Sequence, residues 1–183
     1  MKRIVLYINS KSLNDATSHY IEIVNRAATE LGFVFLITES INNIKFGDII
    51  FTITTNNYIK GFFLRPFCKT IFWSQGIDPE ESMMREKNMF KYYLKSLIEF
   101  IVLSLPSFKL FVSKAMLNHY KNKYNFNAKN YITMPCYNLH YSEPLQKNLN
   151  RYKNPSFVYA GSLSIWQNID ETLQVYKCLE NQI

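Results

Sequence analysis

Two kinds of apolar segment alternate along the chain. Short runs rich in β-branched and aromatic residues each have the length of one strand. They lie at residues 3–8, 33–38, 48–53, 69–74, 109–113 and 130–135. Longer stretches between most of them have apolar residues at helical spacing, most clearly at residues 17–31, 80–105 and 113–126. We therefore expect an α/β fold: a Rossmann-like parallel sheet with helices on both faces.

Residues 142–155 interrupt this alternation. The segment is polar, contains Pro144 and ends at Pro155, and continues no apolar period, so it is interpreted as a linker. The stretch "SFVYAGSLSIWQNIDETLQVY" follows it and has the pattern of a strand, a glycine turn and an amphipathic helix. We expect residues 1–141 to form one domain and residues 156–183 to begin a second one.

The cysteine content and the charge distribution indicate in which cellular compartment the protein works and which class of partner it binds. Three dispersed cysteines favour neither a disulfide framework nor a zinc site, which suits a reducing cytoplasm. Residues 85–154 carry a net charge of +9, whereas the rest of the chain carries −2. Such a basic segment indicates phospholipid, nucleic acid or a phosphorylated substrate as a partner, or simply a solvated face of lysine-rich helices.

Candidate chemistry lies at the strand ends, because open parallel sheets bind ligands outside their carboxyl edge. Asn9 and Ser10 follow the first strand, Gln75 and Gly76 the fourth, and Ser113 and Lys114 the fifth. Gly76 and the acids after it also suit a helix start, and Glu80 and Glu81 would oppose a phosphate there.

The loop "AGSLSIWQN" differs, because no acid precedes Asp170. Backbone amides at Gly161 and Ser162 could approach a phosphate. Trp166, beside Gln167, either stacks on a base or sugar or packs against its own helix.

Several familiar sites are excluded. The chain has no GxGxxG dinucleotide motif, no phosphate-binding P-loop and no GxSxG elbow. Its three histidines are isolated, so no metal site is predicted, and His19 fits a helix surface better than a general base. No helix-turn-helix, RRM or KH signature is present, so nucleic acid is not an expected partner.

The order of several motifs resembles the N-terminal part of bacterial GT-B glycosyltransferases, close to the retaining glycosyltransferase family 4. The motifs are "IFWSQGIDPEES", "LFVSKAMLNHY", "YITMPCYN" and "YAGSLSIWQN". The resemblance implies an acceptor-side domain at 1–141 and a truncated start of the donor-side domain at 156–183. It implies transfer of a sugar from a nucleotide-sugar to a glycan or lipid-linked acceptor in surface polysaccharide synthesis, without a metal or other cofactor.

By position, the resemblance implies donor contacts at Gly161, Ser162, Trp166 and Gln167. It implies cleft-facing positions at Asn9, Ser10, Gln75, Gly76, Ser113 and Lys114. The chain departs from the family pattern in lacking a Gly-Gly pair after its first strand, an Arg after Gly161 and the later acidic donor motif. The 183-residue chain alone is therefore expected to be inactive, and its catalytic residues are not identified.

Lys87, Lys91 and Lys95 recur at four-residue spacing beside an apolar stripe of Phe90, Leu94, Leu97, Ile98 and Ile101. The helix is expected to be buried, with this stripe packed against the core of the protein. The lysines form either a solvated ridge or a peripheral contact with the anionic inner face of the plasma membrane. The alternative to an enzyme is a truncated GT-B half that acts as a non-catalytic binding or partner subunit.

Overall fold

The computed structural model describes residues 2–9, 13, 15–127, 129–135 and 168–180. Six parallel strands form one sheet in the order β2-β1-β3-β4-β5-β6. The strands are β1 (Arg3–Tyr7), β2 (Val34–Thr38), β3 (Ile49–Thr52), β4 (Lys69–Ser74), β5 (Phe108–Phe111) and β6 (Tyr131–Thr133). The sheet confirms the predicted fold class. The strand order reverses between β1 and β3, as in other doubly wound folds.

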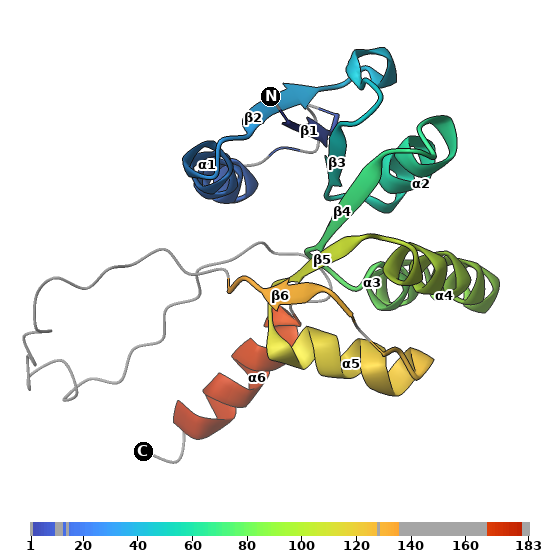
Figure 1. Cartoon of the computed structure of the whole chain (residues 1–183). Helices are drawn as coiled ribbons and strands as arrows, with labels where there is room; N and C mark the ends of the chain where they lie inside the picture. The colour runs from blue at the N-terminus through green and yellow to red at the C-terminus, as the bar shows by residue number, and fades with distance from the viewer. Residues whose placement is uncertain (1, 10–12, 14, 128, 136–167, 181–183) are drawn as a thin grey trace, which may run out of the picture.

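Helices cover the sheet on both faces (Figure 1). They are α1 (Asp15–Glu30), α2 (Thr55–Leu64), α3 (Asp78–Glu86), α4 (Met89–Ser104) and α5 (Lys114–Tyr124), with the short 3-10 helix η2 (Ile41–Asn43) between β2 and β3. A further helix, α6 (Ile169–Glu180), falls within the predicted second β-α unit. The linker at 142–155 and the strand expected before α6 lie outside the described residues.

Alternation along the central strands divides the core between the two faces. On β4, Trp73 packs with Tyr20 and Ile21 of α1, whereas its neighbour Phe72 packs on the opposite face. That opposite face buries Tyr58 of α2, Val102 and Leu103 of α4, and Met116, Leu117 and Tyr120 of α5. Successive strand side chains point to opposite faces, so the continuous apolar runs fill both layers.

Local signals explain most element boundaries. Gly32 has φ +77° and donates its N–H to the carbonyl of Thr29, which ends the first helical segment where the sequence predicts it. The helix begins at Asp15, however, two residues before the start of the helical pattern at residue 17. Helix α2 was not predicted. Thr54 Oγ1 caps it by accepting from the N–H of Asn57.

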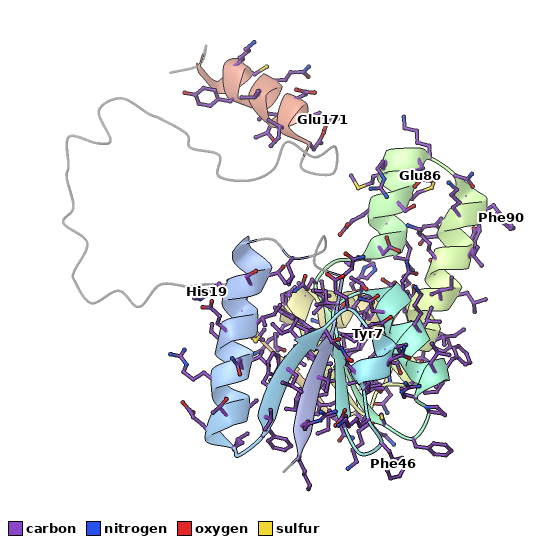
Figure 2. All side chains as sticks on the ribbon, turned by 90° about the horizontal axis from the view of Figure 1, so that it is seen from above. Tyr7, His19, Phe46, Glu86, Phe90 and Glu171 are labelled. Atoms are coloured by element: carbon purple, nitrogen blue, oxygen red, sulfur yellow. The ribbon has the colours of Figure 1, made fainter. Side chains whose placement is uncertain are left out.

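The single helical pattern at residues 80–105 is two helices. Lys87 adopts the left-handed conformation with φ 50°, which ends α3, and the Asn88 side chain caps α4 by accepting from the N–H of Lys91 at 3.0 Å. The two helices form a hairpin (Figure 2). Lys91 Nζ lies 2.6 Å from Glu86 Oε2, and Lys95 Nζ lies 3.0 Å from Asp78 Oδ1. These lysines therefore join α4 to α3, and Lys87 lies in the link between the helices.

The burial predicted for α4 is wrong. Phe90, Leu94, Leu97 and Ile101 are exposed, and Ile98 alone of the predicted stripe is half-buried. The buried face of α4 instead carries Ser96, Glu99, Val102 and Leu103. The polar members of this face lie next to the tyrosines of α5, whose hydroxyls need hydrogen-bonding partners when buried.

Candidate functional site

A pocket of about 450 Å³ opens at the carboxyl edge of β3 and β4. Its wall comes from four places: the β3–α2 connection, the end of β4, the start of α3 and the inner face of α4. The lining residues are Ile53, Thr54, Thr55, Asn56, Phe72, Ser74, Gln75, Gly76, Asp78, Glu81, Lys95, Ile98, Glu99 and Val102. This is the edge at which parallel sheets bind ligands.

Gln75 and Gly76 lie in the pocket wall. A Cβ added to Gly76 would lie 2.5 Å from Glu81 Oε1, so the close approach of that carboxylate requires glycine or a shifted Glu81. Glu81 Oε1 also accepts the N–H of Ile77 at 3.2 Å. The first turn of α3 thus has its own carboxylate at its amide, which opposes phosphate binding there.

Glu99 is the buried acid of the pocket. Glu99 is 8% exposed, and its side chain lies on the inner face of α4. Tyr124 OH donates to Glu99 Oε2 at 2.6 Å, and Lys123 Nζ lies 3.7 Å from the same oxygen. Burial raises the pKa of Glu99 to about 7, although the Tyr124 hydrogen bond and the Lys123 charge both favour its ionised form.

A hydrogen-bond network connects Glu99 to the end of β4. Tyr120 OH lies 3.4 Å from Glu99 Oε1, 2.9 Å from Ser74 Oγ and 3.0 Å from the carbonyl of Gly76. Burial, together with the nearby Glu99 carboxylate, raises the pKa of both Tyr120 and Tyr124, so each stays a protonated donor at neutral pH. Because Gly76 accepts from Tyr120, the loop that carries Gln75 is held against α5.

The charge of the pocket is acidic. Asp78, Glu81 and Glu99 line it, whereas Lys95 is the one cation among the described lining residues and pairs with Asp78. This balance disfavours a phosphate. Carboxylate, amide and hydroxyl groups instead suit hydrogen bonds to a polyhydroxylated ligand, and a carboxyl with a pKa near 7 can take a proton from a bound hydroxyl.

The other predicted residues are divided between the same edge and the undescribed segments. Asn9 follows β1 and is exposed. Ser113 Oγ accepts the N–H of Met116 at 3.0 Å and so caps α5, with the exposed Lys114 as the first residue of that helix. None of these three lines the pocket.

Ser10 and the predicted donor residues Gly161, Ser162, Trp166 and Gln167 lie outside the described residues. His19 lies on α1 and is not part of the pocket wall (Figure 2). Across the described ranges, no group of three or more His, Cys, Asp or Glu side chains could hold a metal ion.

Sequence reasoning missed Glu99, Tyr120 and Tyr124. The available signal was the position of Glu99 as the one acid in "SLIEFIVLSL". An acid inside an apolar helical run is either exposed or buried with partners, and the second case marks a functional candidate. The two tyrosines could not be assigned as its partners before the helices were placed in space.

Comparison with known proteins adds no family assignment. No protein-family model matches the chain, and no curated protein matches it significantly. The resemblance to GT-B glycosyltransferases therefore rests on the sequence motifs, and the fold that those motifs imply agrees with the Rossmann-like sheet.

Proposed function

We propose that this chain provides the acceptor-binding side of a GT-B glycosyltransferase, which transfers a sugar from a nucleotide-sugar to a glycan or lipid-linked acceptor. The observation that carries the proposal is the pocket at the carboxyl edge of β3 and β4, lined by Gln75, Asn56 and three carboxylates. These groups are hydrogen-bonding partners for sugar hydroxyls. Their net negative charge is suited to an acceptor rather than to a diphosphate.

The roles within this proposal follow from position. Gln75 and Asn56 orient the acceptor, and Glu99 accepts a hydrogen bond or a proton from the reacting hydroxyl. Tyr120 and Tyr124 hold Glu99 in place. The positive partners of the leaving diphosphate come from the donor side, for which Gly161 and Ser162 remain the proposed contacts.

Sugar transfer tests the proposal directly. The longest available form of the protein is incubated with a panel of nucleoside diphosphate sugars and with glycan and lipid-linked acceptors, and released diphosphate and product are measured. We expect transfer that falls about 100-fold in Glu99→Gln, the lower range for losing one acid–base group. Lys121→Gln, on the exposed last turn of α5, is the control. Full activity of Glu99→Gln would contradict the assigned role.

A non-catalytic binding subunit is the second candidate. The observation that favours it is that all the described residues of the pocket wall come from residues 53–102, within the acceptor-side domain. Saccharide binding measured by saturation-transfer NMR separates the two. Binding that Gln75→Ala weakens, without transfer by any form of the protein, would favour the binding subunit. If the protein shows no saccharide binding and no sugar transfer, both candidates are contradicted.

A further inference from the structure

The outer surface of α4 is apolar along its whole length. Phe90 is 79% exposed and Leu97 is 57% exposed, and the large apolar side chains around them are exposed too. We call this surface the α4 apolar face; it consists of Met89, Phe90, Tyr93, Leu94, Leu97, Phe100, Ile101 and Leu105. Residues 90, 94, 97 and 101 follow helical spacing, so the side chains form one stripe rather than scattered positions. Figure 2 shows Phe90 pointing away from the body of the protein.

Among the described residues beside this face, Lys87 is a cation without an ion pair. Glu99 is the one acid within residues 89–105, and it is buried on the opposite side of the helix. The exposed Lys87 precedes α4, and Lys91 and Lys95 rise from the helix itself. The last two pair with Glu86 and Asp78 of α3, so these acids offset their charges, and Lys95 lines the pocket. An apolar stripe with the unpaired cation Lys87 at its start complements an anionic lipid surface.

The geometry of α4 fits a helix that lies on a bilayer. Its 16 residues give a length of about 24 Å. Its outer face is apolar, whereas its buried face carries Ser96 and Glu99 beside Val102 and Leu103. None of the helices in the described ranges is long and apolar enough to cross a membrane. The neighbouring helix α2 adds the exposed Phe63 and Leu64 on the same side of the sheet.

We propose that the α4 apolar face inserts into the headgroup region of an anionic phospholipid bilayer, with α4 parallel to the membrane plane. Apolar side chains supply the binding, and Lys87 adds attraction to the acidic lipids. The inner face of the same helix lines the pocket through Lys95, Ile98 and Glu99. Docking therefore places the pocket next to the bilayer. A lipid-anchored acceptor follows from this only together with the proposed function, whereas docking itself does not depend on it.

Vesicle co-sedimentation tests the proposal with the full chain. The protein is mixed with phosphatidylcholine vesicles that do or do not contain phosphatidylglycerol. We expect the wild type to bind the anionic vesicles, and Phe90→Gln with Leu97→Gln to weaken the partition at least about tenfold. Phe46→Gln is the matched control, because Phe46 is 85% exposed and lies before β3, apart from α4 (Figure 2). Circular dichroism verifies that each variant is folded.

The charge contribution has its own variant. Lys87→Glu should reduce binding to anionic vesicles by about fivefold or more and leave binding to neutral vesicles unchanged. Wild-type protein that does not sediment with anionic vesicles would overturn the proposal, as would equal binding by the Phe90/Leu97 variant. Sedimentation equilibrium tests whether a second copy of the chain, rather than lipid, covers the α4 apolar face. A dimer that the same variant dissociates, without vesicle binding, would identify the face as a protein interface. Failure of sugar transfer bears on the proposed function alone.

Discussion

Helices α1 and α4 are both 16 residues long and lie on opposite sides of the sheet, yet α4, unlike α1, exposes most of its large apolar side chains. In α1, Tyr20 and Ile21 are buried against the sheet, while Glu22 and Arg26 face solvent. In α4, the larger apolar stripe faces outward and the polar Glu99 faces inward. An apolar stripe at helical spacing therefore predicts a helix, but it does not predict whether the stripe faces the core or the outer surface.

The neighbours of each helix account for the difference. Helix α1 covers Leu6, Phe51 and Trp73, which offer only an apolar surface. The inner face of α4 covers the pocket and the hydroxyls of Tyr120 and Tyr124 on α5, so Glu99 belongs inside. Burying that carboxyl costs free energy, which its hydrogen bonds and the shift of its pKa reduce.

The largest expected effect is a difference in the free energy of unfolding between alanine substitutions at matched apolar positions of the two helices. Ile21 of α1 is 4% exposed, so Ile21→Ala leaves a cavity and should lower the free energy of unfolding by about 2–5 kcal/mol. Leu97→Ala on α4 removes an exposed side chain and should change it by about 0.5 kcal/mol or less. Urea denaturation measures both. A loss at Leu97 as large as that at Ile21 would show that the α4 apolar face is buried.

The second effect is a pH dependence at the inner face of α4. The pKa of Glu99 rises from its ordinary 4.5 to about 7, so in this interval the folded protein keeps a proton that the unfolded chain releases. Stability should fall with rising pH through this interval, by about 1.4 kcal/mol per pH unit, and level off above it. Glu99→Gln removes this contribution. Parallel pH profiles of wild type and variant would contradict the raised pKa.

A smaller shift is expected from Tyr124→Phe. The Tyr124 hydroxyl donates to the ionised carboxyl of Glu99, so its removal should raise the pKa of Glu99 further. Carbon-detected NMR titration of the Glu99 carboxyl measures this change directly. An unchanged or lowered pKa in Tyr124→Phe would mean that the hydroxyl does not stabilise the charged form.

The smallest effect is at the α3–α4 ion pairs. The Asp78 side chain is 57% exposed, so solvent screens its pair with Lys95. We expect Lys95→Met to change the free energy of unfolding by less than about 1 kcal/mol, as measured by urea denaturation. A larger loss would assign the lysine a structural role beyond joining the two helices.

The sequence predicted the sheet well because strands carry local signals. The six apolar runs at 3–8 through 130–135 each coincide with a strand, and Gly32 ends the first helical segment as expected. Helix α2 was missed because "TNNYIKGFFL" begins with polar residues and contains Gly61. The break at Lys87 was missed because a lysine in the left-handed conformation has no sequence signature.

The candidate site was predicted only in part. Gln75 and Gly76 could be found because they directly follow a strand, and strand ends meet at one edge of a parallel sheet. Glu99, Tyr120 and Tyr124 come from two helices separated by β5, so only the tertiary arrangement brings them together. The outward orientation of the apolar stripe of α4 could not be predicted for the same reason, because the packing of α4 against its neighbours determines it.

The most direct test of the outward orientation of α4 and its insertion in lipid compares labels on the two helices. Cys68, Cys136 and Cys178 are replaced by serine, and a polarity-sensitive fluorophore is attached to Leu97→Cys on α4 or to Arg26→Cys on α1. Anionic vesicles should shift the emission of the label at position 97 to the blue and leave the label at position 26 unchanged. No shift at position 97, or an equal shift at both positions, would contradict the account.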